Sequence, residues 1–175
     1  MRTIEINVYQ FDELSTEAQE RALEKCRLFE VNYNWWEFIY EDAAQVGLKI
    51  EGFCLDASRK IEAEFTEGPE ATAALIIETH GENCDTYKAA QEYTTERAEL
   101  VTKYSDGTNT DRVAEGNEAE FDEDADYVDR EFLNTLRADY WSMLEKEYEY
   151  RTSDEVVKEC IQANGYEFTE EGEIY

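Results

Sequence analysis

Residues 118–150 are the segment that most constrains the fold of this chain. Phe121, Ala125, Val128 and Phe132 recur at the three- and four-residue spacing that places side chains on one face of a helix. Carboxylates fill most of the positions between them, and neither glycine nor proline interrupts the segment. The pattern predicts one long helix over residues 118–150, apolar along one stripe and acidic elsewhere.

The rest of the chain alternates between strand-like and helix-like patterns. Apolar residues alternate with polar ones over residues 3–9, 48–55 and 58–66, and the tail 166–175 has the pattern of a closing hairpin. Helical spacing between capping residues predicts further helices from Ser15 or Thr16, over 35–46, 71–79 and 84–104, and from 153 to 165. These elements predict an α+β fold, in which a small antiparallel sheet formed from both chain ends is packed by several helices, including the long acidic one. We expect one compact domain over residues 1–175, from which the acidic helical segment 115–150 can project.

The charge balance excludes several functions. The chain carries 16 Lys and Arg against 44 Asp and Glu, a formal net charge of −28. Proteins that bind DNA or RNA directly need clustered basic residues to neutralise phosphates, and anionic membrane surfaces make the same demand. So acidic a protein instead attracts basic surfaces, including those that hold nucleic acid. We therefore expect no direct nucleic-acid binding and no membrane binding.

Cysteine and histidine do not form a recognisable site. The single histidine, His80, and the four cysteines show none of the paired spacings of a zinc site, the cysteines being Cys26, Cys54, Cys84 and Cys160. The phosphate-binding loops and nucleophile motifs of common enzymes are also missing from the sequence. We expect a non-enzymatic protein without a cofactor, and its oligomeric state stays open.

One run of aspartates resembles the start of a calcium-binding loop but does not complete the motif. Asp122, Asp124 and Asp126 match the first ligand positions of an EF-hand loop, but Tyr127 and Leu133 stand where that loop needs glycine and glutamate. We expect no metal site here.

The densest run of acids is the candidate functional surface. We call it the acidic face, and it consists of Glu115, Glu118, Glu120, Asp122, Glu123, Asp124, Asp126, Asp129 and Glu131. Carboxylates on one helix face lie about 5–6 Å apart, the same order as the phosphate spacing of about 3.4 Å along a nucleic-acid strand. The sequence thus predicts a phosphate-like ladder that a basic groove would accept. A merely solvated face and the general acidity of a halophilic protein are the alternatives.

Aromatic residues suggest a second kind of surface. Tyr140, Trp141, Tyr148 and Tyr150 are mixed with glutamates near the end of the long helix. Tyrosine and tryptophan beside acids are typical of protein-binding surfaces that meet arginine-rich partners. The alternative function is therefore a protein-binding adaptor or antitoxin-like partner that uses a Tyr/Trp surface.

Three segments carry a resemblance to a known group. The opening Val8–Ser15, the stretch Trp35–Ala43 and the ending Tyr166–Gly172 resemble small uncharacterised acidic proteins of phages and prophages. In composition the chain is also similar to the phage DNA mimics of anti-CRISPR and anti-restriction type. This resemblance implies an inhibitor in the host cell cytoplasm that blocks the basic nucleic-acid-binding groove of a host defence protein, such as a CRISPR effector or restriction enzyme. The acidic face is where we expect that groove to bind.

Overall fold

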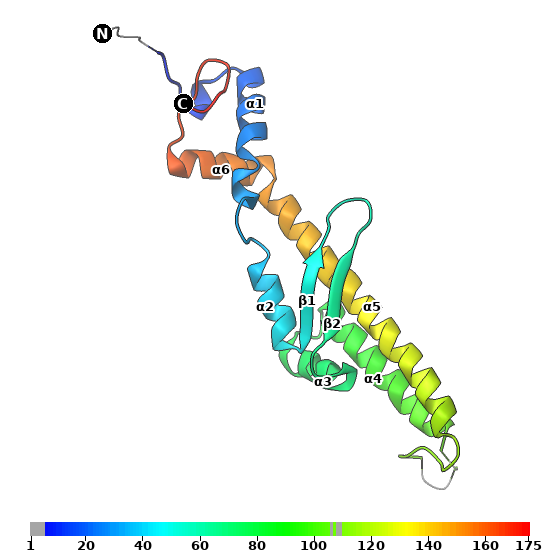
Figure 1. Ribbon diagram of the computed structural model, residues 1–175. Coiled ribbons are helices and arrows are strands. Elements are labelled where there is room, and N and C mark those ends of the chain that lie inside the picture. Colours follow the sequence, from blue (N-terminus) through cyan, green and yellow to red (C-terminus); the bar gives the residue numbers. More distant parts are fainter. Residues whose placement is uncertain (1–5, 106, 108–109) are drawn as a thin grey trace. The chain divides into compact units, whose positions relative to one another are not determined.

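The computed structural model describes residues 6–105, 107 and 110–175. Six α-helices and one two-stranded antiparallel sheet lie in this part of the chain, which is 60% helical (Figure 1). The expected mixture of helix and sheet is confirmed. Residue contacts separate the chain into two compact units.

The two units divide the sequence unevenly. Unit 1 combines residues 1–37 with 145–175, and unit 2 comprises residues 38–144. The helix α5 (Glu118–Arg151) contributes residues to both. The expectations of one domain over residues 1–175 and of a projecting segment 115–150 stay predictions.

The sheet belongs to unit 2 and is a local hairpin. Strand β1 (Leu48–Phe53) pairs antiparallel with β2 (Ile61–Phe65), in a register that is interrupted by a bulge between Ile50 and Gly52. In the turn, the backbone N–H of Ser58 donates to the Asp56 carboxylate at 2.8 Å, which closes the loop locally. The hairpin predicted from residues 48–66 is therefore confirmed, with shorter strands.

The expectation that the sheet is formed from both chain ends is wrong, because the paired strands come from the middle of the chain. Among the described residues, the two ends meet through isolated bridges, with Tyr9 and Phe168 exchanging backbone hydrogen bonds of 2.8 and 2.9 Å. Phe168 also bridges to Ile174 in the tail. These segments are too short to continue a ladder, and residues 3–5 of the expected first strand lie outside the described residues.

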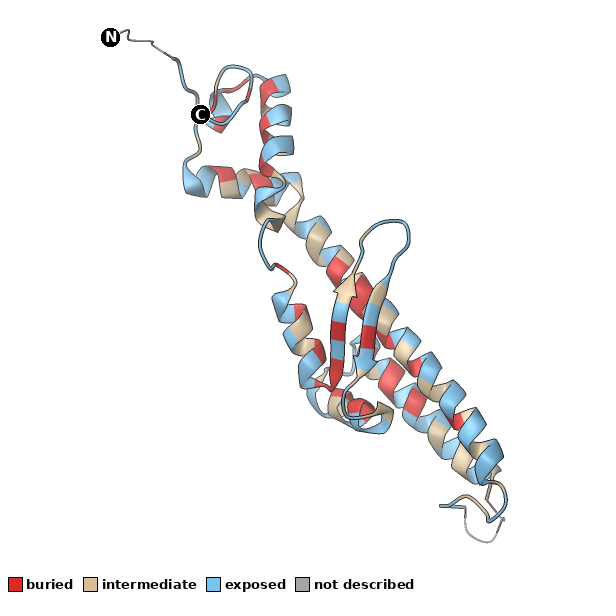
Figure 2. Ribbon diagram, in the orientation of Figure 1, coloured by how far each residue is buried: buried red, intermediate tan, exposed pale blue. Residues whose placement is uncertain are grey.

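Four helices pack with the hairpin in unit 2. They are α2 (Glu37–Gln45), α3 (Pro69–Thr79), α4 (Asp85–Lys103) and the first part of α5. Pro69 stands in the first turn of α3, where its missing N–H costs no helical hydrogen bond. Figure 2 shows in red the buried residues along β1, β2, α4 and α5. The largest fully buried side chains of this unit are Ile39, Val46, Leu48, Ile76, Leu136, Tyr140 and Leu144.

Unit 1 joins the chain ends around two capped helices. Ser15 caps α1 (Thr16–Cys26) by accepting from the N–H of Ala18, and Ser153 caps α6 (Asp154–Asn164) by accepting from the N–H of Val156. Both caps were predicted from the sequence and are confirmed. Short 3₁₀ turns at Phe11–Glu13 and Phe29–Val31 complete the unit. Its core consists of Phe11, Leu14, Ala18, Ala22, Cys26, Val157, Ile161 and Phe168.

The long helix predicted over residues 118–150 is confirmed. α5 runs for 34 residues, one residue beyond the predicted end. Its length would suit a membrane span, but its carboxylates would not. No helix in the described part of the chain is both long and apolar enough to cross a bilayer.

Candidate functional site

The predicted apolar stripe attaches the first part of α5 to unit 2. Ala125 and Phe132 are buried, while Phe121 and Val128 are half-buried. The Phe132 ring stacks on Tyr93 of α4, with ring centroids 4.4 Å apart and an interplanar angle of 17°. This packing fixes which sides of α5 remain available to solvent.

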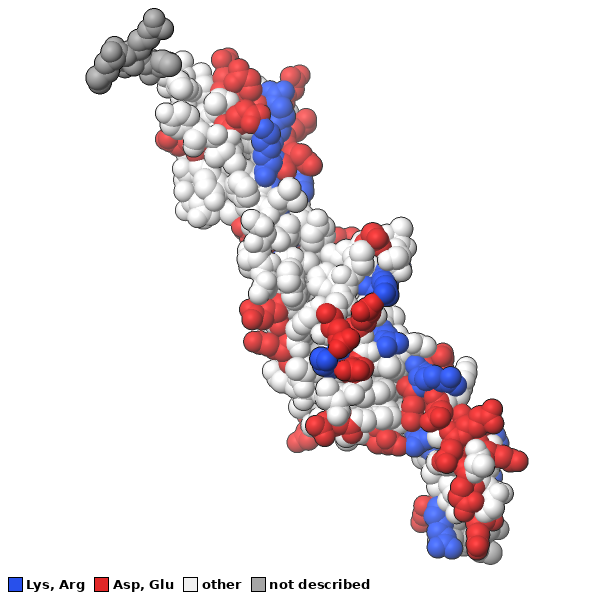
Figure 3. All heavy atoms as spheres, viewed as in Figure 1, with Lys and Arg blue, Asp and Glu red and all other residues white. Residues whose placement is uncertain are grey.

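Most of the acidic face is exposed. Glu115 lies in the loop before α5, and the other eight residues lie on the helix. Asp124 and Asp129 are half-buried, whereas seven residues are exposed, namely Glu115, Glu118, Glu120, Asp122, Glu123, Asp126 and Glu131. Figure 3 shows acidic atoms gathered over this part of α5, at the lower right of the view. The structure therefore brings the predicted residues together, with two of them turned inward.

Asp129 is engaged inside unit 2. Its carboxylate accepts a 2.8 Å hydrogen bond from the Tyr93 hydroxyl and lies 3.8 Å from Nε of Arg97. Burial raises the pKa of the Asp129 carboxyl, although the hydrogen bond from Tyr93 opposes this rise. This residue supports the packing of α4 on α5 more than it offers charge to a partner.

Asp124 is also neutralised within the molecule. Lys103 Nζ lies 2.7 Å from its carboxylate, and the Tyr104 hydroxyl donates to the same oxygen at 2.8 Å. The hydrogen bond from Lys103, followed by that from Tyr104, holds the pKa of Asp124 below its ordinary value. The same contact with Asp124 raises the pKa of Lys103 to about 12. The pair joins the end of α4 to α5.

Two further carboxylates make local hydrogen bonds while remaining exposed. Glu118 accepts from the N–H of Gly116 at 2.7 Å, which satisfies a backbone donor just before the helix begins. Glu131 accepts from the Asn134 side chain at 3.2 Å. Neither contact cancels the negative charge.

The side-chain carboxylates of five acidic-face residues make neither an ion pair nor a hydrogen bond with any residue that the structure describes. We call them the free carboxylates, and they are Glu115, Glu120, Asp122, Glu123 and Asp126. Four of them lie on one folded helix, so their spacing is set by the backbone and not by a partner. They form the part of the predicted surface that can still meet an external cation.

An exposed aromatic residue stands among these carboxylates and was not singled out from the sequence. The Tyr127 side chain is 59% exposed on α5, four residues from Glu123 and four from Glu131. Residues at this spacing are neighbours on a helix surface. The sequence pattern is enough to predict this exposure, because position 127 falls outside the apolar stripe formed by Phe121, Ala125 and Phe132.

The aromatic surface expected near the end of α5 is largely interior. Tyr140 is buried and its hydroxyl donates to Asp42 at 2.9 Å. Trp141 is buried as well, and its indole N–H donates to the Cys54 carbonyl at 2.9 Å. Tyr148 is half-buried, which leaves Tyr150 as the exposed member of that group. These four residues therefore do not form one binding surface.

The carboxylates do not form a calcium loop. Asp122, Asp124 and Asp126 lie within the continuous helix α5, where successive side chains point around the axis and not toward one centre. Among the residues that the structure describes, no group of three or more His, Cys, Asp or Glu side chains could hold a metal ion.

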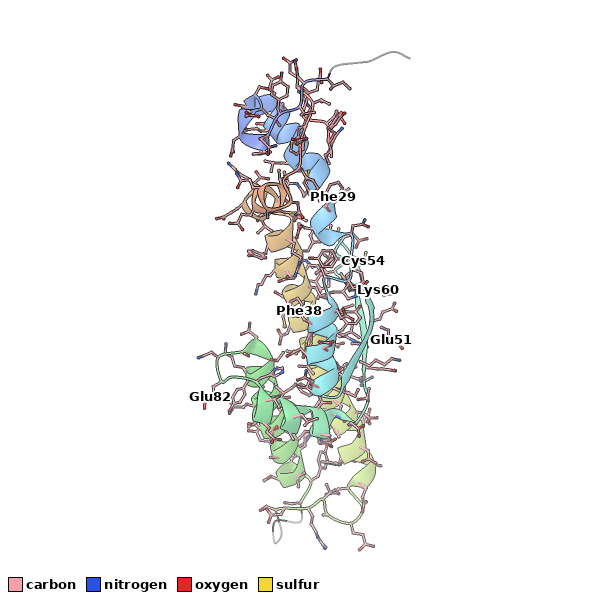
Figure 4. The ribbon with its side chains drawn as sticks, turned by 90° about the vertical axis from the view of Figure 1, so that its left-hand side faces the viewer. Phe29, Phe38, Glu51, Cys54, Lys60 and Glu82 are labelled. Carbon is pink, nitrogen blue, oxygen red and sulfur yellow. The ribbon has the colours of Figure 1, made fainter. Side chains whose placement is uncertain are left out.

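The remaining chemically reactive residues are dispersed. All four cysteines are free thiols. Cys54 is exposed after β1, and its N–H donates to the carbonyl of Lys60 across the hairpin, where Figure 4 shows the two residues as neighbours. His80 Nδ1 forms a 2.7 Å hydrogen bond with the buried Thr86 hydroxyl, so its ring serves the turn between α3 and α4.

Comparisons with family models, with curated protein sequences and with solved structures found no match.

Proposed function

We propose that this chain is a non-enzymatic inhibitor that occupies the basic groove of a nucleic-acid-binding protein. The observation that carries the proposal is the set of free carboxylates, which are exposed on and beside α5 without intramolecular ion pairs to described residues. A surface of this kind presents to a partner the charge that nucleic acid would otherwise supply.

The helix gives these charges a regular spacing. Glu123 and Asp126 are three residues apart, and Asp122 and Asp126 are four apart. Side chains at these separations lie about 5–6 Å from each other on a helix surface, which is the same order as the phosphate repeat of about 3.4 Å per strand of DNA. A groove lined by arginine and lysine would meet several carboxylates at once.

Preorganisation favours tight binding. α5 is packed on α4 through Phe132 and Tyr93 before any partner arrives. A prefolded surface does not lose backbone entropy on association, whereas a disordered acidic tail would. The inward contacts of Asp124 and Asp129 therefore contribute indirectly, because they hold the helix in place.

The net charge of −28 should accelerate encounter with a basic partner. Electrostatic steering raises association rates and weakens with ionic strength. The resemblance to phage DNA mimics suggests a CRISPR effector or a restriction enzyme in the host cytoplasm as the target. Direct binding to nucleic acid is not part of the proposal.

A matched pair of triple variants tests the proposal. In the first, Glu120, Asp122 and Asp126 are changed to Lys. Asp124 is left alone because reversing it would disrupt its contact with Lys103. In the second, the same charge change is made on exposed residues of unit 1 that have no ion pair with a described residue, Glu20, Glu155 and Glu159.

The readout is capture of bacterial nucleic-acid-binding complexes, followed by elution with salt and by displacement with duplex DNA. We expect the wild-type chain and the unit 1 variant to retain a complex that DNA displaces, and the acidic-face variant to lose it. Equal retention by both variants, or a captured partner that is indifferent to DNA, would overturn the proposal.

The adaptor function remains the second candidate because unit 1 exposes apolar side chains. Leu28 is 63% exposed, and Phe29 and Tyr33 lie close to it in sequence with 41% and 50% exposure. Binding of a partner to this surface would persist at high salt and would be lost when Leu28 and Phe29 are changed to Ala. This outcome would favour the adaptor over the nucleic-acid mimic.

A further inference from the structure

A shallow hollow of about 400 Å³ lies beside the acidic face in unit 2. It is open to solvent and is formed between β2 and the first half of α5. Its lining residues are Phe65, Glu123, Asp126, Asp129, Arg130 and Leu133. The hollow therefore combines apolar surface with part of the acidic face.

The apolar part of the lining comes from two half-buried side chains. Phe65 on β2 stacks on Phe132 of α5, with ring centroids 5.8 Å apart and an interplanar angle of 24°. Leu133 is the next residue on α5 and is also half-buried. Because the Phe65 ring is held by this stacking, it presents a fixed aromatic surface to the hollow, and Leu133 adds an aliphatic one.

The charged part of the lining is predominantly negative. Glu123 and Asp126 are exposed free carboxylates, and Asp129 adds a third carboxylate that Tyr93 and Arg97 already engage. The single cation, Arg130, directs its Nε to the backbone carbonyl of Asp126 at 3.1 Å. An apolar surface beside unpaired carboxylates is complementary to a group that is cationic at its tip and apolar along its stem.

We propose that this hollow binds one arginine side chain of the partner protein. The inference rests on the proposed function, because it names the group by which the basic groove is anchored. The arginine stem lies against Leu133, and the guanidinium contacts the Phe65 ring while Glu123 and Asp126 accept its hydrogen bonds. Arginine suits the hollow better than lysine, because its planar guanidinium is weakly hydrated and stacks on aromatic rings.

Short cationic peptides test the inference on the full chain. The probes are an acetylated tetra-arginine amide and the tetra-lysine peptide of equal charge, titrated by NMR at an ionic strength of about 0.05 M. We expect the wild-type chain to bind tetra-arginine at least about threefold more tightly than tetra-lysine. The largest chemical-shift changes should occur at Phe65 and Leu133.

Two double variants separate the hollow from the general charge of α5. E123Q/D126N removes two charges from the hollow, and E120Q/D122N removes two free carboxylates that do not line it. We expect the first to weaken tetra-arginine binding about fivefold or more and the second about twofold or less. Phe65→Leu leaves every charge in place but removes the aromatic ring, so it should reduce the preference for arginine over lysine.

The outcomes distinguish this inference from the proposed function. Equal losses in the two double variants, or equal affinity for both peptides, would overturn the arginine site and leave the acidic face as a diffuse mimic of charge. If neither peptide binds the wild-type chain, both the site and the proposed function fail. Circular dichroism of each variant confirms that α5 remains folded.

Discussion

The Tyr93 hydroxyl on α4 donates a 2.8 Å hydrogen bond to the Asp129 carboxylate on α5. The same carboxylate lies 3.8 Å from Nε of Arg97, one turn further along α4. These donors replace the water that the half-buried carboxylate has lost. A residue that the sequence assigns to a binding surface thus also holds that surface against the rest of unit 2.

Removing the donor in Tyr93→Phe should destabilise unit 2. A hydrogen bond to a charged group contributes about 1.5–3 kcal/mol, and the carboxylate that loses it stays partly buried. We expect the free energy of unfolding, measured with urea, to fall by about that amount. Tyr127→Phe also removes a tyrosine hydroxyl, but from an exposed ring, and should change the free energy of unfolding by less than about 0.5 kcal/mol. Equal effects of the two variants would show that the Tyr93 bond is energetically unimportant.

Asp129→Asn should change how stability depends on pH. Burial raises the pKa of Asp129 above its ordinary value of 3.8, so the folded state holds this proton more tightly than the unfolded state does. The resulting stability is fully present below that value and is lost as the pH rises through the raised pKa. Asparagine cannot titrate, so the stability of D129N relative to wild type should increase between about pH 3 and about pH 7.

Urea unfolding at the two pH values measures this difference. Asp126→Asn controls for the loss of one charge, because Asp126 is exposed and lies one turn away on the same helix. If the difference between D129N and wild type is the same at both pH values, burial does not shift the titration of Asp129.

Gly172→Ala should destabilise unit 1 for two reasons. Gly172 has a φ of 80°, and a Cβ built there would lie 2.2 Å from the carbonyl oxygen of Ala18 on α1. The left-handed backbone costs an alanine about 1–2 kcal/mol, and the displacement of α1 adds about 1–3 kcal/mol. Unfolding by urea, together with hydrogen exchange of the α1 amides, measures the loss.

Gly165→Ala is the matched control for that substitution. Gly165 has a φ of 62°, but nothing lies within 4 Å of its added Cβ. Gly165→Ala should therefore lower the free energy of unfolding by the cost of the left-handed backbone alone, about 1–2 kcal/mol. A loss in G172A no larger than that in G165A would mean that the tail moves away from Ala18 without cost.

Local signals predicted the elements that depend on neighbouring residues. Ser15 and Ser153 cap their helices as expected, and Gly165 ends α6 in a left-handed conformation. The hairpin over 48–66 and the extent of α5 also followed from short-range patterns. Each of these features is determined within a few residues, so a single sequence is enough.

Contacts between residues far apart in the sequence do not follow from such short-range patterns. The alternation over residues 3–9 and the hairpin pattern of residues 166–175 predict strands at the chain ends, yet the described residues of these ends form isolated bridges. Tyr93 on α4 lies 36 residues before its partner Asp129, and Tyr104, which caps the end of α4, lies 20 residues before its partner Asp124. No local pattern connects the members of either pair. The start of α2 also differs from the expected helix over 35–46, since α2 begins at Glu37.

Tyr127→Ala should weaken the binding of arginine-rich probes without affecting the fold. The Tyr127 ring is 59% exposed, and Glu123 and Glu131 flank it at helical spacing, so a guanidinium drawn to these carboxylates can also contact the ring. An exposed cation–π contact contributes about 0.5–1 kcal/mol, which corresponds to a loss of about two- to fivefold in affinity for tetra-arginine. Tyr150→Ala is the control, because Tyr150 is 63% exposed on the same helix but belongs to unit 1 and lies outside the acidic face. Titration by NMR should show the loss in Y127A alone. The same loss in both variants would mean that any exposed tyrosine of this acidic chain attracts the peptide, and that the acidic face has no particular affinity for it.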